Sequence, residues 1–415
     1  MSIQEILNQK IIKRNKYIKE LKSYLDSQVI KVLTWMRRVW KSFILKLLIQ
    51  ELVNDGFVNE KNIFYVNKED LEFDCIKDYN DLNNVFNDFS KNILAWEKIF
   101  VWIDEIQEIK GWEKFVNSIS LKYNEKIEVF ITWSNSNMLS SELSTLIAWR
   151  YIEFEIFPLS LEEYSIFSEK EITRELFLEY LKYGWLPWIF FMNKEDLIIF
   201  NYLKWIYSTI LIKDIIKYFW LRNIDFFESL YKYVFSNIGN IFSAKSISDY
   251  LKSQKVKISP ETVLNYLDYG LKVYVLSLVK AVDPEAKKYF EIYNKYYVWD
   301  LGLRNALVWY DFKRDIWQLI ENYVFLELKR YSYDIKIWRL KSGKEIDFIA
   351  TKNGITKYFQ VCYILGSEET MDREYSSLEA ISDNWEKYVV SFDEIDHWIH
   401  NWIKHINVMN ISEIL

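Results

Sequence analysis

Short apolar runs alternate with longer segments of helical periodicity from about residue 25 to residue 165. Such alternation is typical of βα units that build a parallel sheet. The predicted strands are Val29–Thr34, Ile63–Val66, Lys98–Ile103, Ile127–Thr132 and Tyr151–Phe157. Helices are predicted at Ser42–Val53 and Tyr79–Trp96, and a polar amphipathic helix over residues 1–24. We therefore expect an α/β domain with a parallel sheet over residues 1–165.

The pattern changes after residue 165. Residues 170–235 are mostly of helical type, and Phe242–Val279 predicts a helix, a turn, a second helix and an extended apolar run. From about residue 290 strands return, with a helix at 316–330 and alternating strands over 333–363. No long Gly/Ser/Pro linker is present, so we expect packed domains. Their predicted ranges are 1–165, 166–290 (a helical and winged-helix-like region) and 291–415 (an α/β C-terminal domain).

The segment between the first strand and the first helix has the spacing of a phosphate-binding loop, G-x-x-x-x-G-K-[ST], with Trp at both Gly positions. Its residues are Trp35, Met36, Arg37, Arg38, Val39, Trp40, Lys41 and Ser42. The motif uses glycine because backbone N–H groups must close around phosphates and the chain must take φ > 0. An indole at either position would fill the phosphate cradle. The chain therefore has either a dead nucleotide site or a sequence in which Trp stands for Gly.

Tryptophan is abundant in this chain and glycine is scarce. There are 18 Trp and 9 Gly among 415 residues, and their sum is close to the roughly 7% Gly of average proteins. Trp also occupies positions in turns that favour glycine, as between Thr132 and Ser134. Some uncultured bacterial lineages with A/T-rich genomes read UGA as Gly. We hypothesise that most of these Trp are UGA-encoded Gly in the cell; the alternative is a Trp-rich protein with aromatic cores.

Two acids follow the third predicted strand, 62 residues beyond Ser42. Asp104 and Glu105 have the arrangement of a Walker B element. We expect Asp104 and Ser42 to hold Mg²⁺, Glu105 to polarise the attacking water, and Lys41 to contact the β- and γ-phosphates. The alternative is an ordinary strand end with solvated acids. ATP and Mg²⁺ are the expected cofactors.

The fourth predicted strand ends in small polar residues. Ser134 or Asn135 could act as sensor 1, the residue that orients the lytic water beside the γ-phosphate, although Ser/Asn turns after strands are common. Arg150 precedes the fifth strand and is a candidate for sensing nucleotide or for reaching the site of a neighbouring subunit, with a solvated surface Arg as the alternative.

Charge, cysteine and histidine content bear on whether the chain is a nucleic-acid-binding, secreted, membrane or metal-binding protein. The net charge of −6 gives no bulk nucleic-acid signal, and no signal peptide or membrane-spanning run is recognisable. Cys75 and Cys362 are far apart, which predicts reduced thiols and a cytoplasmic location. His397, His400 and His405 suggest either a metal site or a polar surface turn, and no fourth ligand is nearby.

Taken together, these motifs resemble the bacterial and archaeal AAA-type ATPases that carry a C-terminal domain of unknown function, number 4143. The matching segments cover residues 33–42, 103–107, 111–113, 131–136, 148–150, 157–160, 183–187, 300–304, 320–322 and 345–348. The family has Gly at the positions of Trp35, Trp40, Trp133, Trp149 and Trp185. It has Trp at the position of Trp112, which we expect to be genuine.

The resemblance implies a P-loop ATPase domain, and a C-terminal domain with a restriction-endonuclease-like fold. In that fold an Asp, followed by Glu-x-Lys on the next strand, binds metal for phosphodiester cleavage. The aligned residues here are Asp347, Gln360 and Cys362, so a carboxylate and the Lys are both replaced. We therefore expect no cleavage and a structural role for Asp347 and Glu321.

The winged-helix-like pair, Ser243–Leu251 and Ser259–Leu267, is locally rich in lysine, so it is either a DNA contact or a packing module. The lysines are Lys245, Lys252, Lys255, Lys257 and Lys272. The predicted function is a Mg²⁺-dependent ATPase that couples hydrolysis to a conformational or assembly change. The alternative is a nucleotide-gated DNA- or protein-binding module with little turnover, and an inactive scaffold follows only if the tryptophans are real. A DNA partner, a protein partner and a homo-oligomer stay open, and no membrane association is expected.

Overall fold

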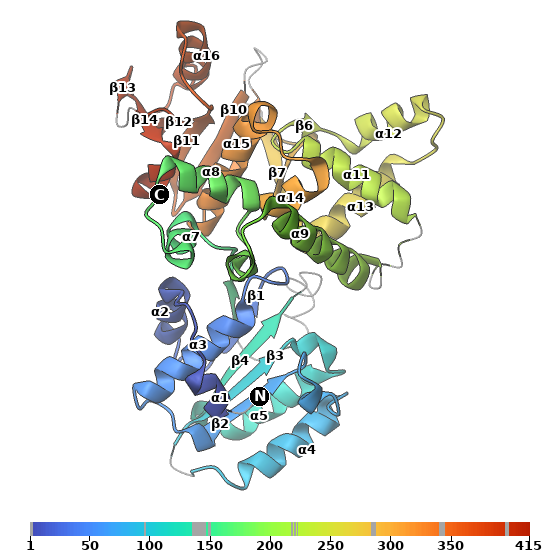
Figure 1. Ribbon diagram of the computed structural model, residues 1–415, viewed down its shortest axis with the longest axis vertical. Helices are drawn as coiled ribbons and strands as arrows, with labels where there is room; N and C mark the ends of the chain where they lie inside the picture. The colour runs from blue at the N-terminus through green and yellow to red at the C-terminus, as the bar shows by residue number, and fades with distance from the viewer. Residues whose placement is uncertain are drawn as a thin grey trace. The chain divides into compact units, whose positions relative to one another are not determined.

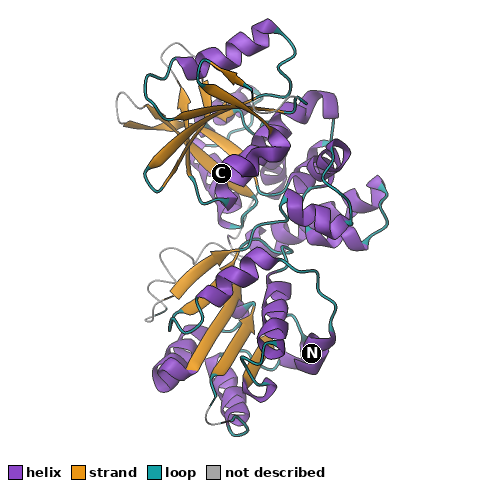
Figure 2. Cartoon of the chain, turned by 90° about the vertical axis from the view of Figure 1, so that its left-hand side faces the viewer, coloured by secondary structure: helices purple, strands orange, loops and turns teal. Residues whose placement is uncertain are grey.

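The computed structural model describes residues 3–94, 97–134, 147, 151–216, 219, 221, 223–283, 288–339, 345–394 and 398–415. The chain forms two compact units, Met1–Phe157 and Pro158–Leu415. Figure 2 shows the strands of each unit in orange and the helices beside them in purple. Throughout the described ranges, no helix combines the length and the apolar character needed to cross a bilayer.

A parallel sheet forms the centre of the first unit, as the alternating pattern predicts. Among the described residues five strands pair in the order β2-β3-β4-β1-β5, and every neighbouring pair is parallel. The strands are β1 (Ile30–Thr34), β2 (Ile63–Asn67), β3 (Ile99–Asp104), β4 (Ile127–Trp133) and β5 (Tyr151–Glu155). Strands β1, β3 and β4 are buried along their whole length, which explains their mostly apolar sequences, and the buried Lys31 of β1 is ion-paired with Glu128 of β4. The predicted α/β class with a parallel sheet is confirmed.

Helices pack against this sheet. They are α1 (Ile3–Asn8), α2 (Asn15–Ser23), α3 (Lys41–Asn54), α4 (Tyr79–Ser90) and α5 (Trp112–Tyr123). Short 3₁₀ turns occur at Glu60–Asn62, Leu71–Phe73, Ile106–Glu108 and Asn124–Lys126. Helices α1 and α2 pack on α3, whereas α4 packs on α5, and both α3 and α5 contact β4. Figure 1 shows α2 and α3 to one side of β3 and β4, and α4 to the other.

Two helix predictions in this unit are wrong. The predicted single helix over residues 1–24 is two short helices, because the guanidinium of buried Arg14 donates to the carbonyls of Val39 (3.1 Å) and Phe157 (2.9 Å) from the segment between them. Helix α4 ends at Ser90 rather than Trp96. The chain then turns so that the Asn62 side chain exchanges hydrogen bonds with the backbone of Leu94 (2.9 and 3.1 Å).

The second unit starts with helices and continues into a sheet. Its helices are α7 (Leu161–Ser168), α8 (Arg174–Tyr183), α9 (Asp196–Ile210), α11 (Ile224–Ser236), α12 (Ala244–Ser253), α13 (Pro260–Lys272), α14 (Leu301–Val308), α15 (Phe312–Arg330) and α16 (Glu368–Glu379). A π-helical segment follows α9 at Leu211–Ile216, and 3₁₀ turns lie at Pro187–Phe191 and Val408–Ile414. Local sequence starts several helices. A capping box of Ser160 and Glu163 begins α7, and Ser259 followed by Pro260 begins α13.

The sheet of the second unit is mixed. In the described part of the chain its strands pair in the order β13-β14-β12-β11-β10-β9-β7-β8-β6. They are β6 (Ile241–Phe242), β7 (Leu276–Asp283), β8 (Lys288–Val298), β9 (Asp334–Arg339), β10 (Glu345–Lys352), β11 (Ile355–Val361), β12 (Glu386–Ser391), β13 (Ile399–His400) and β14 (Ile403–Asn407). Pairs β11–β12, β12–β14 and β7–β9 are parallel, and the other pairs are antiparallel.

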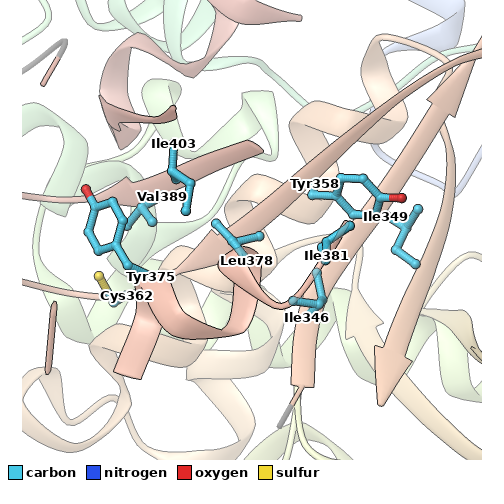
Figure 3. Packing of buried hydrophobic residues seen from close by; sticks show 9 residues of the cluster. All are labelled: Ile346, Ile349, Tyr358, Cys362, Tyr375, Leu378, Ile381, Val389 and Ile403. Carbon is cyan, nitrogen blue, oxygen red and sulfur yellow. The ribbon is translucent and has the colours of Figure 1, made fainter. Parts of the chain in front are cut away.

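Helices α15 and α16 both pack on this sheet, α15 against β8 to β11 and α16 against β10, β11, β12 and β14. Figure 3 shows the apolar cluster beneath α16, where Tyr375 and Leu378 meet side chains of the strands. Helix α15 is buried over most of its length, and several of its polar residues are hydrogen-bonded. The Asn322 side chain, for example, exchanges hydrogen bonds with the backbone of Val298 (2.8 and 2.9 Å). Helix α15 begins at Phe312 rather than residue 316, and the sequence did not predict α14.

A close backbone contact between Gly302 and Tyr183 makes Gly302 sensitive to substitution. A Cβ atom at Gly302 would lie 2.1 Å from the Tyr183 carbonyl oxygen, which belongs to backbone and cannot move aside easily. We expect Gly302→Ala to lower the free energy of unfolding by about 1–3 kcal/mol. Gly366→Ala is the matched control, because its Cβ would meet only Ile364 at an ordinary 3.4 Å and should change stability by less than about 1 kcal/mol. Urea denaturation measures both, and equal effects would contradict the contact argument.

Candidate functional site

The loop between β1 and α3 has the backbone conformation that a phosphate-binding loop requires. Three of its residues have positive φ: Trp35 at 144°, Arg38 at 71° and Trp40 at 70°. Bulky side chains strongly disfavour this region, and glycine enters it without strain. The indoles of Trp35 and Trp40 are buried and lie 4.5 Å from the Phe157 ring and 4.4 Å from the Phe43 ring. The Trp side chains therefore fill space beside a backbone shaped for glycine.

Lys41 starts helix α3, and its ammonium group is held by the loop. Its Nζ donates to the carbonyl oxygens of Trp35 and Met36, both at 2.9 Å, and the side chain is buried. Both partners are neutral carbonyls. A phosphate would offer the ammonium a stronger, charge-assisted partner at the same position.

Ser42 and Asp104 meet at the carboxyl ends of β1 and β3. The Ser42 hydroxyl is hydrogen-bonded to the Asp104 carboxylate, and Thr132 of the neighbouring strand β4 also donates to it. The same Thr132 hydroxyl accepts from the backbone N–H of Glu105 at 2.8 Å. Burial raises the pKa of Asp104 to about 6, and the nearby Glu105 carboxylate adds to the rise. This carboxyl group would gain from a nearby cation.

Glu105 has the opposite electrostatic environment. Burial opposes its ionisation, but the positive charges of Lys41 and Arg37 outweigh burial and hold the pKa of Glu105 below its usual value. The Ser134 hydroxyl and the Gln107 amide both donate to its carboxylate, and Arg37 Nη1 lies 3.8 Å from Oε2. Glu105 is therefore a charged, oriented carboxylate next to an Asp with a raised pKa, which is the separation expected for acid and base roles.

The structure brings most of the predicted nucleotide-site residues together. Residues 35–42, Asp104, Glu105 and Ser134 lie at one end of the sheet, whereas Asn135 and Arg150 lie outside the described residues. Sequence reasoning did not identify the contacts that Gln107 and Arg37 make with Glu105. Gln107 lies two residues after Glu105, and this closeness in the sequence could have indicated the contact. Arg37 also pairs with Glu69 and Glu108 at 3.7 and 3.9 Å, which no local pattern indicates.

A second group of polar residues gathers in the other unit. Asp347 on β10, Gln360 on β11, Cys362 and Glu321 on α15 line one cavity of about 910 Å³. The buried ammonium of Lys295 on β8 lies between carboxylates, 2.9 Å from Glu321, 3.0 Å from Asp347 and 2.6 Å from Glu345. Sequence reasoning missed Lys295, because nothing local to β8 shows which acids it meets. Over the described ranges no three His, Cys, Asp or Glu residues are grouped for a metal ion.

The remaining sequence candidates are dispersed. His400 is exposed, and His405 is buried beside the Ser391 hydroxyl at 2.8 Å, whereas His397 lies outside the described residues. Cys75 and Cys362 are free thiols. The lysines of the winged-helix-like pair at positions 245, 252, 255 and 257 are exposed, but Lys272 pairs with Asp268 of the same helix at 2.7 Å. The structure therefore offers no histidine metal site among the described residues.

Comparison with known proteins places the ATPase motifs in a family context. Residues 27–165 match the AAA domain family AAA_14, and residues 174–315 match the domain of unknown function DUF8612. The sequence prediction named domain 4143 instead, and that identity stays a prediction. Among solved structures, an Aeropyrum pernix Orc1 protein in complex with DNA is similar over 72% of this chain and 93% of its own, at 10% identity and a TM-score of 0.32.

Two uncharacterized proteins align over nearly the whole chain. A Methanocaldococcus jannaschii protein is 29% identical over 396 residues, which cover 91% of this chain and 84% of the relative. A Haemophilus influenzae protein is 32% identical over 392 residues, which cover 93% of this chain and 94% of the relative. The AAA domain makes this an ATP-binding, ATPase-like protein. The chain belongs to the same family as the uncharacterized Haemophilus influenzae protein.

Proposed function

We propose that this protein binds Mg²⁺–ATP at the loop of residues 35–42 and hydrolyses it. The observation that carries the proposal is the left-handed backbone at three loop positions, next to Lys41, Ser42, Asp104 and Glu105. Two of these three positions, 35 and 40, are the glycine positions of the phosphate-binding motif, in which the backbone N–H groups must close around phosphates. The AAA_14 match over residues 27–165 supports the same assignment.

The residues present fit the two groups that the family implies. Lys41 is the cation for the β- and γ-phosphates, and loop N–H groups surround them once side chains leave the cradle. The Ser42 hydroxyl and Asp104 carboxylate are adjacent hard oxygen donors, the type that Mg²⁺ prefers. Bound Mg²⁺ neutralises charge on the transferring phosphoryl group.

Glu105 is the residue we assign to the attacking water. Its carboxylate is ionised at neutral pH and is fixed by Ser134 and Gln107, so it can accept a hydrogen bond from water and orient it. Arg37 neutralises part of its charge at 3.8 Å. Asn135 and Arg150 stay predictions for the sensor roles.

Several features support the hypothesis that most Trp codons are read as Gly in the host. Across the described residues, positive φ occurs at four Trp but at one Tyr and at no Phe, although the whole chain holds 18 Trp, 30 Tyr and 27 Phe. The four are Trp35, Trp40, Trp309 and Trp402. Three other Trp, at positions 102, 133 and 185, have buried indole N–H groups without a hydrogen-bond partner among the described residues, although buried Trp normally finds one. In the described residues, Trp therefore adopts the backbone conformation that favours glycine more often than Tyr or Phe does.

The consequence of hydrolysis is also part of the proposal. We infer that it drives a conformational or assembly change, and the alternative is a nucleotide-gated module that binds DNA or protein with little turnover. The restriction-endonuclease-like fold of the C-terminal region stays a prediction, supported by the gathering of Asp347, Gln360 and Glu321 around one cavity. Lys295 stands between Glu321 and Asp347, so we propose that this region has no metal-dependent nuclease activity.

The first test of this proposal concerns positions 35 and 40 of the loop. The double variant Trp35→Gly/Trp40→Gly should bind Mg²⁺–ATP at least about 100-fold more tightly than the Trp form, because it frees the phosphate cradle. Isothermal titration calorimetry measures both affinities. Trp309→Gly is the matched control, since it makes the same change at an exposed left-handed position outside the loop and should not alter the affinity. Equal affinity of the double variant and the Trp form would reject the proposal.

The second prediction separates binding from chemistry in the double-variant background. Lys41→Ala should weaken ATP binding by about tenfold or more, because the phosphate loses its ammonium partner. Glu105→Gln should retain binding but lower the hydrolysis rate by about 100-fold or more, because it keeps the size of the side chain and removes the charge. Phosphate-release kinetics with parallel calorimetry test both. An undiminished rate for Glu105→Gln would exclude Glu105 as the water-orienting acid.

The third prediction follows from the raised pKa of Asp104. Between about pH 4 and pH 6 the folded chain holds a proton on Asp104 that the unfolded chain releases. The free energy of unfolding therefore falls as the pH rises through this range to about 6. Asn does not ionise, so Asp104→Asn removes the cost of burying a carboxylate at high pH. It should raise the unfolding free energy of the nucleotide-free protein at pH 8 by about 2–3 kcal/mol.

In the Trp35→Gly/Trp40→Gly background, the same substitution should abolish the Mg²⁺-dependent strengthening of ATP binding, because Asn lacks the negative charge. Urea denaturation at pH 8 and at pH 4 measures the unfolding free energies of the Asp104→Asn and parent proteins, which should be equal at pH 4. Asp88→Asn is the control, since Asp88 is exposed and, among the described residues, forms an ion pair with neighbouring Lys91. A destabilised Asp104→Asn protein at pH 8 would contradict the assigned electrostatics.

A further inference from the structure

Four of the thirteen described residues that line the cavity of about 910 Å³ in the second unit are acidic. Four carboxylates face it: Glu321 on α15, Glu345 and Asp347 on β10, and Glu374 on α16. Arg373 is the one basic residue among the described residues that line it. The cavity therefore has a strong excess of hydrogen-bond acceptors over donors.

The nearby positive charges leave part of this acidity unbalanced. Lys295 lies within 3.0 Å of Glu321, Glu345 and Asp347, and its single charge is shared among the three. The Arg373 guanidinium donates through Nε and Nη2 to one oxygen of Glu374, at 2.9 and 2.6 Å. Among the described residues, two cations thus make ion pairs with the four carboxyl groups that line the cavity.

An unused acceptor is also built into the wall. Gln360 is 9% exposed, and its side chain is hydrogen-bonded to the Glu374 carboxylate. Its carbonyl oxygen Oε1 is buried and has no partner among the described residues. A buried acceptor without a partner is unfavourable, so a ligand that brings an N–H donor would gain a hydrogen bond there.

The electrostatics favour an arriving positive charge. Burial raises the pKa of Glu321 to about 7, opposed by Lys295 and increased by Asp347. Burial likewise raises the pKa of Glu374, and Asp347 again adds to the rise. A cation would relieve this repulsion, whereas a nucleic-acid phosphate would increase it.

We propose that this cavity binds an organic cation that carries several N–H donors, a guanidinium or a polyamine ammonium group. Its charge would pair with Glu374 and Glu345, and an N–H would donate to Gln360 Oε1. A metal ion fits less well, because the Lys295 ammonium already occupies the point between Glu321, Glu345 and Asp347. The cation arrives either free in solution or as an arginine side chain of a protein.

Calorimetric titration of the full chain at low salt tests the proposal without nucleotide. The probes are agmatine, spermidine and the peptide acetyl-Gly-Arg-Gly-amide. We expect saturable binding of at least one probe, weakened about tenfold or more by Glu374→Gln and by Glu345→Gln. Glu379→Gln is the matched control, because it removes the same charge from helix α16 at a side chain that does not line the cavity. It should change the affinity less than about twofold.

The outcomes separate the two sources of the cation. Tighter binding of agmatine or spermidine indicates a free cation, and tighter binding of the peptide indicates an arginine side chain. Circular dichroism and thermal unfolding show whether each variant is folded. If Glu374→Gln does not fold, Glu345→Gln carries the test, because the Glu345 side chain is partly exposed. Absence of saturable binding by all three probes, or equal loss in Glu379→Gln, would overturn the proposal.

Discussion

The backbone of the loop at residues 35–42 is the constraint on which the function depends. Positive φ at Trp35, Arg38 and Trp40 turns the chain sharply from the end of β1 into α3. That turn brings the loop carbonyls to the Lys41 ammonium and sets Ser42 beside Asp104. Glycine adopts this conformation without strain and leaves the enclosed space open, whereas tryptophan does neither.

The two units handle buried charge in different ways. At the end of the parallel sheet, adjacent acids are driven apart in pKa, with Asp104 raised by burial and Glu105 lowered by Lys41 and Arg37. We propose that this site binds a divalent cation and a nucleotide. In the mixed sheet, Lys295 permanently supplies the positive charge between carboxylates. The first arrangement gives two adjacent acids opposite shifts in pKa, and the second places a lysine between its acids.

The sequence predicted the elements whose signals are local. Continuous apolar runs identified the strands of the parallel sheet, since both faces of each strand are covered. Side-chain bonds over long sequence distances caused the errors. Arg14 interrupts the predicted first helix by bonding to Phe157, and Asn62 turns the chain after Ser90 through Leu94. The sequence did not predict the ion pairs of Lys295 either, because its acidic partners lie far away in the sequence, on α15 and β10. The assigned roles of the nucleotide-site residues stay predictions.

Mass spectrometry of the protein isolated from the cells that carry the gene tests the central claim most directly. Peptides that cover positions 35 and 40 report which residue the host inserts there. The account predicts glycine at both positions, with a mass lower by one Trp-to-Gly difference for each. Tryptophan at these positions would contradict it, because the indoles would then fill the phosphate cradle in the living cell.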